Sequence, residues 1–182
     1  AYLRAVAGPT AGARYPAWLP TAAPEPSTRV ARVAWCYGDL GVAVALMAAA
    51  AATERAELRE AAVELAHGMA ARPFDGSLVT DAGLCHGAAG VAHLFNRLGQ
   101  ATGDRELAAA AERWFGHLLA LRRAEPIGGW PRGLASEAGP TWEAAPDLLT
   151  GATGVALALH AAITPIEPGW DQLLLADLSP MP

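Results

Sequence analysis

The chain carries the pattern Gly-x-x-Gly-Val-Ala three times, and this repeat limits its fold more than any other feature. The three copies begin at Gly38, Gly87 and Gly151. They are therefore 49 and 64 residues apart, spacings that are typical of helical units which stack or close into a ring. An apolar run follows each copy, so each unit should begin with a glycine-rich turn that opens a helix.

Apolar helices are expected directly after the three turns. They should span residues 41–52, 88–100 and 152–163. Apolar residues lie nearly all round these helices, which predicts that they are buried. Alanine and leucine dominate the segments, and both residues favour helix.

An amphipathic helix is expected after each of the first two apolar helices. The segments 54–72 and 105–123 repeat apolar residues at three-to-four spacing and carry their charged residues largely on other faces. Thr53 and Asp104 stand where N-caps are expected. One buried and one amphipathic helix per unit predicts two concentric layers, which is an all-α fold of the α/α-toroid type.

The remaining stretches should be loops. Residues 8–31, 73–83 and 125–147 are rich in proline and glycine, and no strand is evident in the sequence. We expect a single domain with a loop-rich lead-in over residues 1–31 and helical repeats over residues 32–182. Loops that precede the buried helices should gather at one end of the toroid, where functional residues are often found.

Composition excludes several classes of protein. Apolar residues make up 53% and charged residues 17% of the chain, which is incompatible with general disorder. The net charge is -5 and there is no basic cluster, so nucleic acid is not an expected partner. The longest apolar run, Val42 to Ala52, is shorter than the ~20 residues that cross a bilayer, and we expect no transmembrane segment. With no signal peptide evident, the expected location is cytoplasmic.

Two cysteines occupy the same place in two of the repeats. Cys36 and Cys85 each stand two residues before the first repeat glycine, and His86 follows Cys85. The third repeat has Leu149 and Thr150 at these two places, and neither is a good metal ligand. Two thiolates and one imidazole are a reasonable zinc set that leaves one tetrahedral position open, as in catalytic sites. The pattern predicts one zinc ion; the alternatives are cysteines that only pack in the core or form one disulfide.

Other polar and aromatic residues have structural interpretations. Asp39 is expected to cap a helix, and Asp81 can hold His86 in place from outside the metal shell. The remaining histidines lie within expected helices and are assigned structural roles: His67, His93, His117 and His160. The tryptophans of the loops either line a peptide groove or anchor the core: Trp18, Trp130 and Trp142.

Three motifs together resemble those of the lanthionine synthetase C-like proteins, the family of lanthipeptide cyclases and their relatives. These motifs are Trp-Cys-Tyr-Gly at 35–38, Cys-His-Gly at 85–87 and Trp-Asp-x-Leu-Leu-Leu at 170–175. The resemblance covers roughly residues 28–175. It implies an α/α toroid with one zinc ion at one end of its cavity. It also implies zinc ligands at Cys36, Cys85 and His86 and catalytic roles for Arg32 and Tyr37.

The resemblance implies an activity and partners as well. A cyclase of this kind adds the cysteine thiols of a peptide to dehydroalanine or dehydrobutyrine and so closes thioether rings. The expected substrate is a dehydrated precursor peptide, which a dehydratase supplies. Without the resemblance, Arg32 would be interpreted as a surface ion pair and Tyr37 as a packing residue beside Trp35.

The chain also departs from the family pattern. Many members have Thr-Pro-Gly after the first motif, where this chain has Asp39-Leu40-Gly41. The family carries a His-Gly motif further upstream, whose histidine is a candidate acid or base, and this chain has no counterpart. We therefore expect it to supply about half of the toroid, with the other half either absent from this fragment or supplied by a second chain, and we expect activity to depend on that other half.

Two other functions compete with the cyclase. Zinc in a toroid can also serve prenyl transfer or the addition of glutathione-like thiols, and prenyl transfer would call for a carboxylate ligand such as Asp39 or Asp81. A non-catalytic scaffold, in which zinc only staples the repeats, would require a fourth protein ligand.

Overall fold

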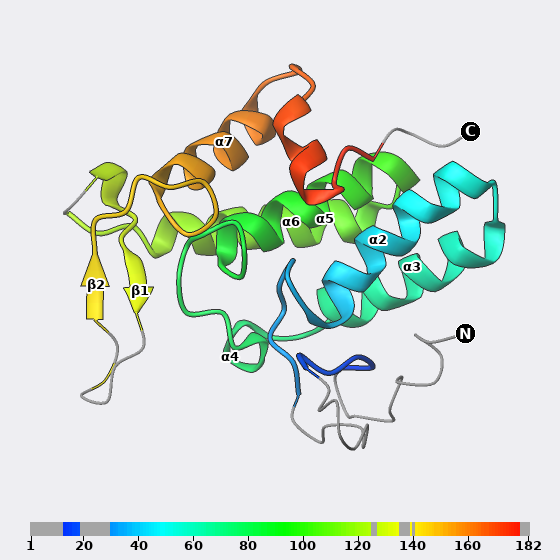
Figure 1. The fold of residues 1–182 in the computed structure, drawn as a ribbon, viewed down its shortest axis with the longest axis horizontal. Coiled ribbons are helices and arrows are strands. Elements are labelled where there is room, and N and C mark those ends of the chain that lie inside the picture. The colour runs from blue at the N-terminus through cyan, green and yellow to red at the C-terminus, as the bar shows by residue number, and fades with distance from the viewer. Residues whose placement is uncertain (1–12, 19–29, 125–126, 135–138, 140, 179–182) are drawn as a thin grey trace.

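The helices form two layers, as the repeat predicts (Figure 1). The computed structural model describes residues 13–18, 30–124, 127–134, 139 and 141–178. One layer consists of the three apolar helices that follow the repeat turns: α2 (Gly38–Thr53), α5 (Ala88–Thr102) and α7 (Ala152–Ile163). The other consists of the two amphipathic helices: α3 (Ala56–Ala70) and α6 (Arg105–Ala120).

Contacts between helices confirm this arrangement and the all-α class. Helix α3 packs on α2, α6 packs on α5, and α3 also contacts α6. Within the first layer, α5 lies between α2 and α7 and contacts both. Helix α7 has no amphipathic helix of its own among the described residues and contacts the short η1 segment (Ile127–Gly129).

Short elements occupy the connections. They are the single turn α4 (Phe74–Ser77), the strands β1 (Arg132–Leu134) and β2 (Thr141–Glu143), and the 3-10 segment η2 (Gly169–Leu174). The two strands form an antiparallel hairpin in which Gly133 pairs with Trp142. The expectation of no strand was therefore wrong, because a pair of three-residue strands is too short to show an alternating pattern.

Two of the three polar caps expected from the sequence are not formed. Asp104 does cap α6 and accepts hydrogen bonds from the amides of Glu106 and Leu107 at 2.8 and 3.1 Å. Thr53 instead ends α2, and its hydroxyl donates to the carbonyl of Ala49 at 2.6 Å. Its hydroxyl can reach back one turn because the chain leaves the helix only at residue 54.

Asp39 is the other cap that is not formed. It lies inside the first turn of α2, is 4% exposed, and its carboxylate accepts hydrogen bonds from the amides of Arg14 and Tyr15 at 2.7 and 2.6 Å. The carboxylate therefore fastens residues 13–18 to the start of α2. These residues form no helix, as expected for the lead-in, while residues 1–12 and 19–29 of that prediction lie outside the described part of the chain.

The second glycine of each repeat is required by close packing of the turn against its own helix. A Cβ atom at Gly41, Gly90 or Gly154 would lie 2.1, 1.8 or 2.0 Å from the carbonyl oxygen of Trp35, Leu84 or Leu148. Contacts under 3 Å cannot be accommodated, so a side chain at these places would push the turn away from the helix. The repeat pattern thus sets the path of the chain just before each helix of the first layer.

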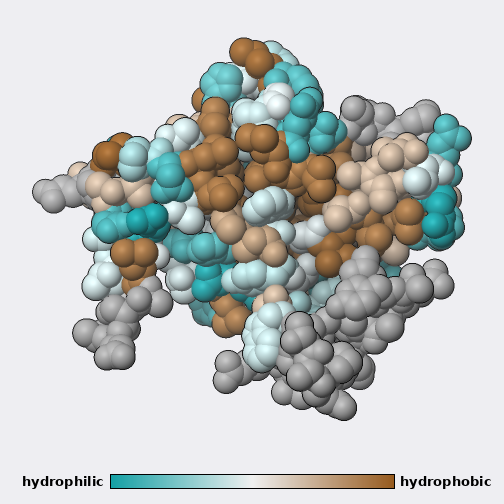
Figure 2. All heavy atoms as spheres, viewed as in Figure 1, coloured by the Kyte–Doolittle hydropathy of each residue, from teal (hydrophilic) through white to brown (hydrophobic). Residues whose placement is uncertain are grey.

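Burial differs between the centre and the edges of the first layer. Helix α5 has buried residues on all its faces, whereas α7 leaves apolar side chains exposed, with Ile163 at 80%. Apolar side chains gather across the middle of the face shown in Figure 2, over α7, η2 and α2. No helix in the described residues is both long and apolar enough to cross a membrane.

Candidate metal centre

Backbone hydrogen bonds join the three repeat turns into a ladder. The amide of Cys85 donates to the carbonyl of Leu149 at 2.8 Å. The carbonyl of Cys85 in turn accepts from the amides of Trp35 and Cys36 at 3.1 and 3.4 Å. The bonds from Cys36 to Cys85 and from Cys85 to Leu149 connect equivalent positions of neighbouring repeats, so the ladder brings the two cysteines to the same end of the first layer.

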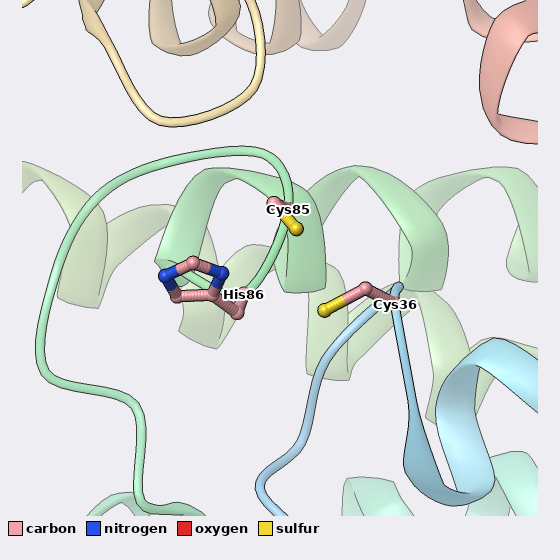
Figure 3. A group of neighbouring side chains, drawn as sticks. All are labelled: Cys36, Cys85 and His86. Atoms are coloured by element: carbon pink, nitrogen blue, oxygen red, sulfur yellow. The ribbon is translucent and has the colours of Figure 1, made fainter. Parts of the chain in front are cut away.

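The ladder gathers three potential metal ligands. The ligand atoms of Cys36, Cys85 and His86 all lie within 4.8 Å of one another. Figure 3 shows both sulfur atoms directed into the space between the two turns, with the imidazole alongside. Zinc–sulfur bonds of ~2.3 Å in tetrahedral geometry place two sulfurs roughly 3.8 Å apart. Small side-chain rotations would therefore suffice to close the group around one ion.

The three side chains differ in accessibility. Both cysteines are free thiols; Cys36 is exposed, and Cys85 and His86 are half-buried. Within the described residues no other histidine, cysteine or acid joins the group. The exposed side of Cys36 leaves room for a thiol from outside the protein to approach.

Electrostatics make this group unfavourable for negative charge on its own. Burial raises the pKa of the Cys85 thiol to about 12, and the hydrogen bond to Cys36 and the negative charges of Cys36 and Asp81 add to this effect. The positive charge of Arg32 acts in the opposite direction. A divalent cation among these groups would offset the repulsion and favour the thiolate form, so the donor set fits a metal ion.

Asp81 lies beside His86, as expected from the sequence. Its Oδ2 atom is 3.5 Å from Nε2 of His86, and its Oδ1 atom accepts a hydrogen bond from the amide of Gly83 at 3.2 Å. This contact leaves Nδ1 as the imidazole nitrogen that is available to a metal. The carboxylate is thus placed to fix the orientation of the ring.

Tyr37 and Arg32 stand next to the thiols. Burial raises the pKa of Tyr37, and the nearby Arg32 charge opposes this rise while Cys36 and Cys85 add to it. Both residues are half-buried, and the Arg32 charge also acts on Cys85. The structure therefore brings the two residues close to the group, and their catalytic assignment remains a prediction.

The other histidines lie away from the group and make structural contacts in three of four cases. His67 is 2.8 Å from Asp104, His117 stacks on Phe74, and His160 is exposed on α7. His93 is fully buried, with Nε2 3.0 Å from Oδ2 of Asp171. Only the position of Asp171 within the closing motif at 170–175 could have pointed to this buried pair.

Of the three loop tryptophans, only Trp130 meets one of the two expectations, that of anchoring the core. The indole of Trp130 donates to the carbonyl of Leu118 at 3.0 Å and its ring packs against the core. Trp142 lies on the hairpin under Arg123, whose guanidinium carbon is 3.9 Å from the ring centre. Trp18 is 61% exposed and anchors nothing in the core.

Fold and site together define a helical-repeat protein with a Cys-Cys-His group at the turns of two repeats. The model of the lanthionine synthetase C-like protein family matches residues 12–175. This match spans most of the chain, which therefore belongs to that family. No curated protein shows significant sequence similarity to the chain.

Proposed function

We propose that this chain carries the zinc-binding part of a lanthipeptide cyclase. The reaction would be addition of a peptide cysteine thiol to dehydroalanine or dehydrobutyrine, with formation of a lanthionine or methyllanthionine ring. The observation that carries the proposal is the convergence of Cys36, Cys85 and His86 within 4.8 Å in a member of this family. The substrate is a dehydrated precursor peptide, made by a dehydratase, in a reducing compartment such as the cytoplasm.

The three side chains would hold one zinc ion and leave its fourth position to the substrate. Zinc would supply positive charge that favours the thiolate form of the peptide cysteine. A free thiol has a pKa of about 8.5, so only roughly 3% is ionised at pH 7. Full ionisation would lower the barrier by about 2 kcal/mol.

Tyr37 and Arg32 would act on the charge that develops during addition. The sulfur forms a bond to the β-carbon, and the π electrons move onto the carbonyl oxygen to give an enolate. Arg32 would stabilise that charge, and the Tyr37 hydroxyl would donate a hydrogen bond to it. The α-carbon then takes a proton from a donor that we place outside the described residues.

The edges of the first layer support an incomplete toroid. Helix α5 is enclosed by a neighbour on each side, whereas α7 exposes Ile163 and other apolar side chains. Further helical units against these edges would bury that surface, and each Å² of apolar area buried is worth roughly 25 cal/mol. We propose that a second polypeptide segment of the same type completes the ring and that activity requires it.

The donor set favours thiol addition over the competing functions. Prenyl transfer calls for a carboxylate ligand, but Asp39 is engaged with backbone amides. Asp81 contacts the imidazole of His86 and the amide of Gly83, and the Cys-Cys-His group of the described residues contains no acid. A structural zinc staple calls for a fourth protein ligand, and the exposed Cys36 leaves that side of the group open.

Zinc content of the purified chain tests the proposal. We expect about one zinc per chain in the wild type and near none in Cys36→Ala and Cys85→Ala, because two ligands cannot hold the ion tightly. Leu149→Ala is the matched control, since it changes the equivalent position of the third repeat and should keep its zinc. A well-folded wild type without zinc would exclude the catalytic site.

An activity assay completes the test. Ring closure does not change the mass of the peptide, so it is followed by the loss of alkylatable thiol in a dehydrated model peptide. The upstream half of the toroid is added in one series of reactions. Turnover of free glutathione in place of the peptide thiol would instead indicate the related addition reaction.

A further inference from the structure

The segment that follows α7 is fastened to the central helix by a buried group of charges. Oδ2 of Asp171, in η2, lies 3.0 Å from Nε2 of His93 and 3.1 Å from Nε of Arg97, both on α5. The side chains of these three residues are 0–5% exposed. Such a group is costly to bury unless its members are paired, so the contacts define one position for η2 on α5.

Two further contacts hold the same segment. The ring of Trp170 lies on that of His93 with 4.7 Å between centres. The guanidinium of Arg97 also donates to the carbonyl of Ala176 at 3.1 Å. Residues 169–176, which we call the C-terminal latch, are therefore fixed to α5 at both ends.

The latch also reaches the turn that carries Cys36. The indole Nε1 of Trp35 donates to the carbonyl of Leu174 at 2.8 Å, across 139 residues of sequence. On its other side, the backbone of Trp35 and Cys36 donates to the carbonyl of Cys85. The turn before α2 is thus held between the second repeat and the latch.

Apart from the hydrogen bond between its thiol and that of Cys85, the Cys36 side chain has few contacts that fix its position. Its side chain is exposed, unlike that of Cys85, so packing contributes little to its position. Its amide hydrogen bond of 3.4 Å is long. The backbone that carries the sulfur directly follows Trp35, whose indole is held by the Leu174 carbonyl.

We propose that Asp171 is a positioning residue that acts through the latch on Cys36. Asp171 fixes η2, the Leu174 carbonyl fixes the Trp35 indole, and Trp35 fixes the turn that presents the Cys36 thiol to the metal. The consequence for zinc rests on the proposed function, whereas the order of the turn does not.

The first measurement is hydrogen exchange of the Cys36 amide in the metal-free full chain. Trp35→Phe keeps an aromatic ring but removes the donor to Leu174, and we expect Cys36 protection to fall roughly tenfold. Asp171→Leu should give a similar loss, and Asp171→Asn, which keeps an acceptor for His93, should retain most of the protection. If Asp171→Leu does not fold, Trp35→Phe and Asp171→Asn decide.

A control separates positioning from general destabilisation. Asp104→Ala removes the cap of α6, far from the latch in sequence and on the other layer, and should leave Cys36 protection unchanged. Wild-type protection in Trp35→Phe would overturn the proposal, and so would an equal loss in Asp104→Ala.

Zinc affinity provides the second measurement. The dissociation constant of the folded chain, measured by competition with a chelator, should rise about tenfold in Trp35→Phe and in Asp171→Leu. Both substitutions break the same connection between the latch and the Cys36 turn. The dissociation constant of the double variant should therefore be little higher than that of either single variant. An unchanged affinity in Trp35→Phe would overturn the link to the metal. A wild type that binds no zinc would refute the proposed function, and the exchange data alone would then decide whether the latch orders the turn.

Discussion

The turns before α5 and α7 have nearly the same backbone but different chemistry. Gly87 and Gly151 precede the helices with φ of -105° and -107° and ψ of -179° and -175°. The first helical amide of each donates to the carbonyl seven residues earlier, from Ala88 to Asp81 at 2.9 Å and from Ala152 to Ala145 at 2.8 Å. These two turns therefore share one backbone although their side chains differ, whereas the turn before α2, in which Gly38 has φ of +76°, follows another path.

The side chains of the two turns make different contacts. In the second repeat, Cys85 and His86 face Cys36, with Asp81 beside the imidazole. In the third repeat, the carboxylate of Asp147 accepts hydrogen bonds from the amide and hydroxyl of Thr150 at 2.8 and 3.1 Å. One turn presents ligands, and the other satisfies its own polar groups. The backbone of a repeat and the chemistry it carries are thus specified by separate residues.

The largest expected effect comes from breaking the shared backbone. Gly90→Ala places a Cβ atom 1.8 Å from the carbonyl oxygen of Leu84, and the turn must move away from its helix. We expect the free energy of unfolding to fall by at least about 3 kcal/mol, or the chain not to fold at all, because backbone atoms cannot yield like a side chain. Gly154→Ala should behave alike, with 2.0 Å to Leu148. Urea unfolding followed by circular dichroism measures both.

A glycine without neighbours serves as the control for this prediction. Gly116 lies in α6, and a Cβ there meets nothing within 4 Å. Gly116→Ala should leave stability unchanged or raise it by up to ~1 kcal/mol, because alanine favours helix. A Gly90→Ala protein as stable as the wild type would show that the glycine pattern does not set the backbone of the turns.

Because different residues specify the backbone and the chemistry of a turn, the sequence predicts some features of the molecule well and others poorly. Glycine spacing and apolar runs identify all five long helices, since these signals are local and repeat three times. They also place Cys36 and Cys85 at equivalent positions. The roles of Asp39 and Asp171 depend instead on partners far along the chain, so no local pattern predicts them. The hairpin at 132–143 escapes detection because each strand has only three residues.

The next largest effect is expected on zinc affinity, when the carboxylate of each of the two turns is removed in turn. Asp81→Asn removes the negative charge beside Nε2 of His86, and we expect the zinc dissociation constant to rise about tenfold. Asp147→Asn changes the carboxylate of the third turn, which lies next to Thr150, and should leave zinc affinity unchanged. Chelator competition on the folded chains gives both constants. Equal losses in the two variants would mean that the carboxylate acts through the fold and not on the imidazole.

The smallest expected effect concerns the pH dependence of the third turn. The backbone hydrogen bond from Thr150 is the main reason why the pKa of Asp147 is lowered, with the Thr150 hydroxyl and the Arg132 charge acting in the same direction against the effect of burial. A carboxylate with a lowered pKa stabilises the fold above its unfolded pKa of about 3.9, and the contribution is lost as the pH falls through its folded pKa. Because the side chain is 44% exposed, solvent screening should keep this contribution below about 0.5 kcal/mol.

Comparing Asp147→Asn with the wild type isolates this contribution. The difference in unfolding midpoint should be present at pH 7 and should shrink toward pH 3, where the wild-type carboxylate takes up a proton. Glu112→Gln, at an exposed acid on α6, serves as the reference for a general change of charge. A difference that stayed constant down to pH 3 would mean that the amide and hydroxyl of Thr150 are held by the shape of the turn and not by the charge of Asp147. The geometry of the third turn would then not depend on the charge of its carboxylate.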